Sequence, residues 1–147
     1  MAGFHYRLER VLELRKQAVE QHKQMLARMI AATRAAQAAV LALETEQTRM
    51  NTAWCEAART GLTPQAALDF ANFTTELERR KRQAQAELER AQTEELARRA
   101  LLDIAMNKQK VLEKPKARAL KRYQVETGRK DQAALDEFAT LRGDKKK

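Results

Sequence analysis

Residues 4–60 read FHYRLERVLELRKQAVEQHKQMLARMIAATRAAQAAVLALETEQTRMNTAWCEAART, with neither glycine nor proline. Two series of positions, each repeating every seven residues, run through this stretch and alternate at steps of three and four. This spacing keeps one stripe of an α-helix facing a partner helix, as in a coiled coil. One series is Leu12, Val19, Leu26, Thr33, Val40, Gln47 and Trp54, and the other is Leu8, Arg15, His22, Met29, Ala36, Leu43 and Met50.

A helix over this stretch would be about 80 Å long, at a rise of about 1.5 Å per residue. A single compact core cannot enclose such a rod, so we expect an elongated coiled coil that works by contact. The composition agrees, because charged residues make up 33% and aromatic residues 5% of the 147 residues. This mixture favours long helices over a deep aromatic core.

The sequence lacks signals for secretion and membrane insertion. A single cysteine, Cys55, cannot form an intramolecular disulfide, which fits a reducing compartment. The N-terminus has no apolar run of signal-peptide length, and no stretch approaches the roughly 18 apolar residues that a membrane span needs. We therefore expect a soluble cytoplasmic protein without direct membrane insertion.

The net charge of +9 is concentrated near the C-terminus. Residues 1–55 contain eight basic and five acidic side chains, residues 56–107 eight and nine, and residues 108–147 thirteen and six. A positive region of this size attracts nucleic acid, anionic lipid or an acidic protein surface, and charge alone does not choose among them.

Residues 59–64, Arg-Thr-Gly-Leu-Thr-Pro, separate two helical stretches. Glycine after a helix end and a Thr-Pro pair at the next helix start are typical of such a break. A short link between long amphipathic helices predicts an antiparallel hairpin. Lys81, Glu95 and Arg98 fall on or beside the apolar stripe of the second helix, so we expect looser packing or an exposed functional surface there. The apolar positions of that stripe are Phe70, Phe73, Leu77, Ala84, Leu88, Ala91, Leu102, Ala105 and Leu112.

Pro115 removes a backbone hydrogen bond and crowds the preceding turn, so we expect a kink or local break there. Residues around His5 should lie opposite residues around Ala117, and everything after Pro115 should overhang the hairpin. The expected fold is all-α, a long antiparallel two-helix coiled-coil hairpin with a kinked C-terminal helical extension. One elongated domain should cover residues 1–142, with helices over about 5–58 and 64–140 and a turn over 59–63. A disordered basic tail should follow over 143–147.

No constellation for catalysis, cofactor binding or metal binding is present in the sequence. Glycine-rich phosphate loops are absent, and His5 and His22 have no accompanying cluster at metal-ligand spacing. We therefore expect no enzyme activity, no cofactor and no metal. Trp54 fits the hairpin core better than a base-stacking platform. The neighbouring cluster either closes the turn end or remains free as an apolar patch for a partner; its members are Phe70, Phe73 and Leu77.

Three segments, in this order and spacing, carry a family resemblance. They are Phe4-x-Tyr6-x-Leu8-Glu9-x-Val11-Leu12-x-Leu14-Arg15, Phe73-x-x-x-Leu77-Glu78, and Asp131-Gln132-x-x-Leu135-Asp136-Glu137-Phe138-Ala139. They resemble the opening, the early second helix and the C-terminal motif of the flagellar type III export protein family FliJ. The resemblance covers nearly the whole chain.

The resemblance implies an antiparallel coiled coil similar to the central stalk of rotary ATPases. Proteins of that family enter the pore of the hexameric export ATPase and promote its ring assembly. They also bind the cytoplasmic domain of the export gate protein and certain export chaperones. Phe73 and Leu77 match the family's gate-binding surface, although Arg80, Ala84 and Pro115 depart from the family pattern. The implied location is the cytoplasm, with peripheral association at the inner membrane of the flagellar basal body.

For the ATPase ring, we expect contacts from the C-terminal overhang, where positive charge would attract an acidic pore. Leu135 with Phe138 should pack against the start of the first helix or against the ring. Two alternatives stay open: an equivalent stalk of a virulence type III secretion system, and a basic coiled coil that binds nucleic acid. The second lacks a recognition module, so nucleic acid is not an expected partner. The basic residues expected to contact the ring are Arg118, Lys121, Arg122, Arg129 and Lys130.

Overall fold

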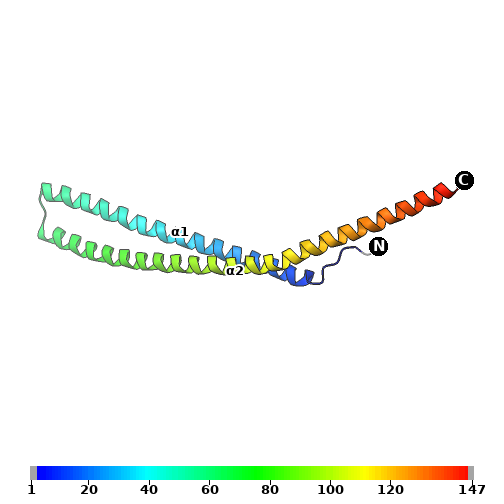
Figure 1. Cartoon of the computed structure of the whole chain (residues 1–147). Helices are drawn as coiled ribbons and strands as arrows, with labels where there is room; N and C mark the ends of the chain where they lie inside the picture. The colour runs from blue at the N-terminus through cyan, green and yellow to red at the C-terminus, as the bar shows by residue number, and fades with distance from the viewer. Residues whose placement is uncertain (1–2, 146–147) are drawn as a thin grey trace. The chain divides into compact units, whose positions relative to one another are not determined.

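The chain folds into two long helices that pack against each other as an antiparallel coiled-coil hairpin (Figure 1). The computed structural model describes residues 3–145. Helix α1 spans Glu9–Thr60 and helix α2 spans Pro64–Asp144. Within residues 3–145 there is no strand. The predicted all-α hairpin is confirmed.

The ends of the helices differ from the sequence expectation. Helix α1 begins at Glu9, whose backbone N–H donates to the carbonyl of Tyr6 at 3.1 Å, so the residues before it form an entry turn. At the other end, Gly143 and Asp144 belong to α2 and Lys145 lies in a turn, where the sequence predicts a disordered tail. The rest of that predicted tail, residues 146–147, lies outside the described residues.

A three-residue turn over 61–63 joins the two helices. Gly61 has a φ of 102°, a left-handed conformation that glycine adopts without a steric penalty. The hydroxyl of Thr63 accepts a hydrogen bond from the N–H of Ala66 at 3.2 Å, which caps the start of α2, and Pro64 occupies the first turn. These are the N-cap and N1 preferences of helices. The predicted glycine stop and Thr-Pro start are both present.

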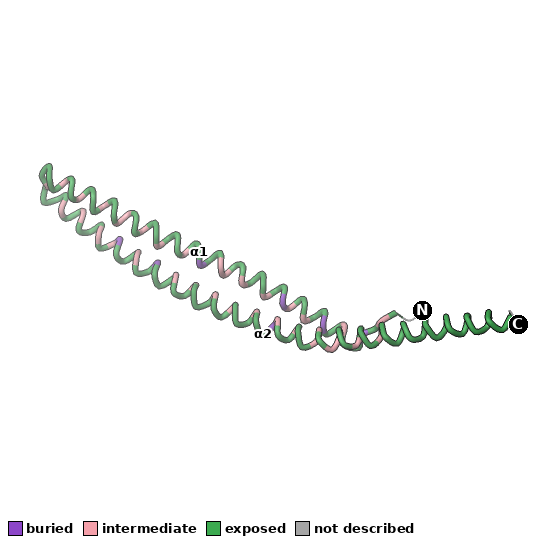
Figure 2. Tube along the Cα trace, turned by 45° about the horizontal axis from the view of Figure 1, so that its top comes forward, coloured by how far each residue is buried: buried purple, intermediate pink, exposed green. Residues whose placement is uncertain are grey.

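The heptad seam predicted for α1 is its buried face. The chain divides into two compact units, Gln21–Leu102 and the pair Met1–Glu20 with Asp103–Lys147. In each unit, buried positions recur along the inner side of the paired helices, while the outer sides are exposed (Figure 2). Every predicted seam position from Leu12 to Trp54 is buried or half-buried, whereas Leu8 is exposed.

Helix α2 carries a seam as regular as that of α1. From Ala67 to Tyr123, half-buried and buried positions recur at alternating steps of three and four, the signature of knobs-into-holes packing. The sequence pattern obscures this regularity because polar residues occupy several seam positions. Phe73, expected on the stripe, lies off the seam and is exposed. The polar seam residues of α2 include Lys81, Glu95 and Arg98.

Helix α2 continues through Pro115 with no local break. Because proline has no N–H, the carbonyl of Val111 loses its helical donor. One residue along, the carbonyl of Leu112 accepts a hydrogen bond from the hydroxyl of Tyr6 at 3.0 Å. A kink at Pro115 stays a prediction.

Pairing with the N-terminal segment extends beyond Pro115. The ammonium of Lys116 lies 2.8 Å from Oε1 and 2.7 Å from Oε2 of Glu9. The rings of Phe4 and Tyr123 pack with their centroids 5.6 Å apart. The overhang predicted after Pro115 therefore starts only after Tyr123. The predicted opposition of His5 and Ala117 agrees with these contacts, which lie on either side of both residues.

Helix α1 is long and apolar enough to cross a membrane when only length and composition are considered. This corrects the expectation that no stretch approaches such a span. Alanine accounts for much of the apolar character, as in residues 31–42, AATRAAQAAVLA. The signal is weak, because a core helix of a soluble protein passes the same test.

Candidate partner-binding surfaces

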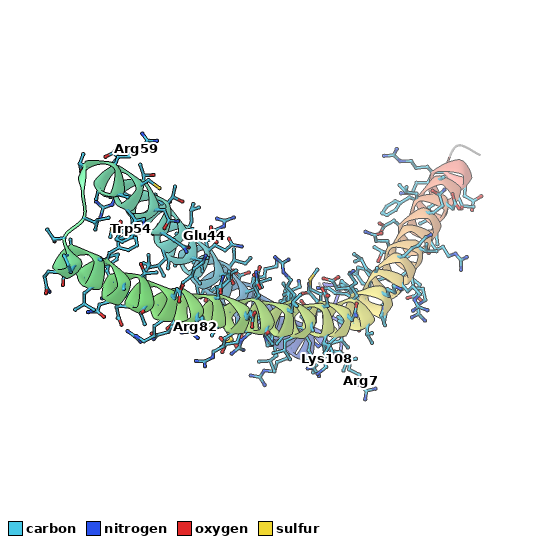
Figure 3. All side chains as sticks on the ribbon, turned by 90° about the vertical axis from the view of Figure 1, so that its left-hand side faces the viewer. Arg7, Glu44, Trp54, Arg59, Arg82 and Lys108 are labelled. Carbon is cyan, nitrogen blue, oxygen red and sulfur yellow. The ribbon has the colours of Figure 1, made fainter. Side chains whose placement is uncertain are left out.

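Two aromatic rings close the hairpin next to the turn. Trp54 on α1 stacks on Phe70 on α2, with ring centroids 4.3 Å apart and planes inclined by 24°. In Figure 3, Trp54 points toward α2, whereas Arg59 and Arg82 point outward. Phe70 therefore belongs to the core of this end.

The structure separates the two residues predicted to bind the export gate. Leu77 is buried, with 6% of its surface accessible, whereas Phe73 is 39% exposed at the edge of the hairpin. The helical spacing of four placed them on one stripe in the sequence, but the seam passes through Phe70, Thr74 and Leu77 and leaves Phe73 outside. Phe73 alone can touch a partner while the hairpin stays closed.

An exposed ionic cluster follows Phe73 along α2. The carboxylate of Glu76 lies 2.7 Å from Nη2 of Arg79 and 3.1 Å from Nε of Arg80. Hydrogen bonds from Arg79 and then Arg80 lower the pKa of Glu76 to about 2. The side chain of Arg80, a residue that departs from the family pattern, is thus fixed by an ion pair with Glu76 one turn earlier in α2.

Polar side chains meet across the seam in unit Gln21–Leu102. The ammonium of Lys81 on α2 donates to Oε1 of Gln47 on α1 at 3.0 Å. Both residues are half-buried. Further along, the guanidinium of Arg98 lies 3.4 Å from the sulfur of Met25. Two long basic side chains of α2 thus reach across the seam to atoms of α1.

A second polar layer lies at Thr33, which is buried. Its hydroxyl donates to the carbonyl of Met29 at 3.0 Å and faces the carboxylate of Glu95. Arg99 donates to Glu95 at 3.0 Å. The hydrogen bond from Arg99, helped by Thr33 and the charge of Arg34 and opposed by burial, lowers the pKa of Glu95. The sequence places Thr33 and Glu95 on the stripes but does not show that they meet.

Residues 124–145, called the C-terminal arm below, have no partner helix. Every residue in this range is exposed, and Figure 2 shows this part of α2 uniformly as exposed. Leu135 is 63% exposed and Phe138 is 68% exposed. The expectation that they pack against the start of the first helix is wrong, because pairing with that segment ends at Tyr123. Contact with the ring remains the other expected role.

A basic face leads into the arm. A shallow, open hollow runs along one side of α2, where residues spaced by three and four lie above one another. Four of the five basic residues predicted to contact the ATPase line it, and Lys130 is exposed but does not. The lining residues are Arg118, Lys121, Arg122, Val125, Glu126 and Arg129.

No group of three or more metal-ligating side chains comes together among residues 3–145. Three exposed surfaces stand out: the edge around Phe73, the basic face and the arm.

Comparison with known proteins gives one match. A family model described as flagellar FliJ protein matches residues 4–147, essentially the whole chain. No curated protein and no solved structure matches the chain.

Proposed function

This chain belongs to the flagellar FliJ protein family, a component of the flagellar type III export apparatus, and we propose that it is the stalk that enters and activates the hexameric export ATPase. In this proposal it has no enzymatic activity and works in the cytoplasm, associated peripherally with the inner membrane at the basal body. It links the ATPase to the export gate and binds export chaperones. The family match favours a flagellar stalk over one from a virulence system.

The unpartnered arm is the observation that carries this proposal. A lone helix is about 10–12 Å across with its side chains, so it enters a narrower channel than a pair of helices does. The arm exposes apolar side chains at Leu135, Phe138 and Leu141, which gain stability only when something covers them. A ring lumen supplies such cover from all sides.

The basic face supplies the electrostatic part of the proposal. Arg118, Lys121, Arg122 and Arg129 lie along one side of the helix that leads into the arm, with Lys130 one residue further. A row of positive charge speeds the approach to an acidic pore and fixes orientation within it. Because these side chains are exposed, their contribution falls as salt screens them.

For the export gate, we propose Phe73 as the surface contact. Phe73 exposes an aromatic ring on the same side of α2 as Arg80, and arginine and large aromatic side chains are enriched among binding hot spots. In this proposal buried Leu77 contributes indirectly, because it packs this part of α2 against α1.

The ATPase proposal is tested by deleting residues 124–147. This cut keeps the contacts of Glu9 with Lys116 and of Phe4 with Tyr123, which a cut at Pro115 would remove. We expect stimulation of the purified export ATPase to be lost while circular dichroism still reports a folded hairpin. Arg129→Glu with Lys130→Glu should weaken stimulation, and Arg82→Glu, an exposed basic residue of the other unit, is the matched control. Unchanged stimulation by the truncated chain contradicts the proposal.

The gate contact is tested by pull-down with the cytoplasmic domain of the export gate. Phe73→Ala should lower gate binding roughly tenfold or more, as hot-spot truncations do. Leu68→Ala is the control, because Leu68 is also an exposed apolar side chain of α2 near the turn. Leu77→Ala should lower the free energy of unfolding, which separates its effect from that of Phe73. Full gate binding by Phe73→Ala removes this residue from the site.

A further inference from the structure

The two sides of the coiled coil in the unit formed by residues 3–20 and 103–145 differ in chemistry. In an antiparallel pair, residues one position before a seam residue lie on one side of both helices, and residues one position after lie on the other. We call these the leading side and the trailing side. On the leading side, Val11 precedes the seam residue Leu12, and Val111 precedes Leu112.

The leading side carries an exposed apolar cluster contributed by both helices. Val11 and Leu14 on α1 are 39% and 60% exposed, and Ile104 and Val111 on α2 are 52% and 67% exposed. Counting from the ion pair of Glu9 with Lys116, Leu14 lies level with Val111. We call Val11, Leu14, Ile104 and Val111 the leading-side patch.

The charges around this patch are all of one sign. Lys108 lies between Ile104 and Val111 in the leading row of α2. Arg7 and Arg118 lie level with each other at one end of the patch, beyond Val11 and Val111. In Figure 3, Arg7 and Lys108 both extend along the same edge of the molecule. The acidic residues of this stretch that border the seam fall on the trailing side: Glu9, Glu13, Glu20, Asp103 and Glu113.

From this arrangement we propose that the leading-side patch docks one amphipathic helix of a partner protein, with an apolar stripe flanked by acidic residues. Two parallel rows of side chains on neighbouring helices form a groove that receives a third helix. The basic residues that border the patch match acidic flanks and oppose basic ones. The patch uses neither the arm nor Phe73, and of the residues that border it only Arg118 also belongs to the basic face, so the proposal goes beyond the proposed function.

A second copy of this chain is the wrong occupant. Packing two leading-side patches together would place Arg7, Lys108 and Arg118 of both copies in one interface. Like charges at an interface lower affinity and suppress such pairing. An acidic helix brings the opposite charge to the same basic residues, which favours its binding.

The test uses a synthetic amphipathic peptide of about 20 residues, long enough to form a helix, with leucines along one face and glutamates beside them. A matched peptide carries lysines in place of the glutamates. Binding to the full chain is measured by fluorescence anisotropy and mapped by methyl NMR. We expect the glutamate peptide to bind about tenfold tighter than the lysine peptide and to shift the methyl signals of Leu14, Ile104 and Val111.

Variants decide where the peptide binds. Leu14→Asp with Val111→Asp should lower the affinity for the glutamate peptide about tenfold or more. Leu41→Asp is the control, because Leu41 is 63% exposed on the other unit. Lys108→Glu should weaken the glutamate peptide and strengthen the lysine peptide. Circular dichroism checks that each variant stays folded.

Three results would overturn the proposal. The first is equal affinity of the two peptides. The second is unchanged affinity in Leu14→Asp with Val111→Asp. The third is patch-dependent self-association in sedimentation, or patch-dependent binding to phosphatidylglycerol vesicles, without peptide binding. None of these assays contains the export ATPase, so their failure is distinct from failure of the stalk proposal.

Discussion

Two stretches of the same helix show what α1 provides to α2. From Ala67 to Tyr123 α2 has a half-buried seam, and from residue 124 to 145 every side chain is exposed. Both stretches are charged, contain alanine and leucine, and have helical backbone. The difference is the partner helix, because isolated helices are marginal in water and gain most of their stability from packing. The arm is therefore the part of the molecule whose order depends most on a partner.

The largest contrast between the two stretches should appear in amide hydrogen exchange. Amides near Leu12 and Val19, which are buried, should open only with global unfolding, and amides of the arm should open locally. A difference in protection on the order of 1000-fold is expected between them. NMR-detected exchange on the full chain measures it. Equal protection would show that the arm is stabilised by a contact not described above.

The next largest effect should come from removing a core side chain. Leu12 is fully buried, and Leu12→Ala should lower the free energy of unfolding by about 2–4 kcal/mol. Leu135→Ala, at an exposed position, is the control and should change it by less than about 0.5 kcal/mol. Urea denaturation followed by circular dichroism gives both values. A similar cost for both substitutions would mean that the arm is packed in solution.

A smaller effect should come from replacing the polar layer of Gln47 and Lys81. The double substitution to leucine should raise the free energy of unfolding by about 1 kcal/mol, because apolar residues replace a half-buried polar pair in a seam. Gln47→Leu alone should lower it by a similar amount, since Lys81 loses its acceptor. A double-mutant cycle measured by urea denaturation separates the interaction energy of the pair from the effect of each substitution alone. If the changes in the free energy of unfolding simply add, Gln47 and Lys81 do not interact directly.

The smallest effect should be the pH dependence from Glu76. Its folded pKa is lowered to about 2, so its contribution to stability is present above the ordinary pKa of about 4.5 and is lost as pH falls toward 2. Because this group is exposed, the effect is slight and fades in high salt. NMR titration of the Glu76 carboxyl in Arg79→Ala with Arg80→Ala should give a pKa near the ordinary value. If the Glu76 carboxyl of that variant still titrates near 2, the two arginines are not the cause of its lowered pKa.

Much of the fold follows from the sequence of α1. Its apolar residues recur at heptad positions, and glycine and proline are confined to the turn, so burial follows the pattern from Leu12 to Trp54. The seam of α2 was harder to predict because Lys81, Glu95 and Arg98 occupy seam positions. Their polar groups are paired by side-chain contacts there. Pattern reasoning treats such residues as surface.

The candidate sites were predicted less well than the fold. Phe73 and Leu77 share a helical spacing, yet only the position of the seam decides that one is buried and the other exposed. The start of the unpaired stretch was misplaced because Phe4 and Glu9 reach Tyr123 and Lys116. Such contacts connect residues more than 100 positions apart, and no local pattern encodes them.

The stacking of Trp54 on Phe70 beside the Gly61 turn has a consequence for the order of folding. Contacts beside the turn close a small loop, whereas the hydrogen bond from Tyr6 to Leu112 joins residues 106 positions apart. Because the entropy lost on loop closure grows with loop length, the hairpin should zip up from the turn toward the termini. Trp54 is the single tryptophan of the chain. Its fluorescence should therefore report the first event of folding. The pairing of the N-terminal segment with α2, through Tyr6 and Leu112, should form last.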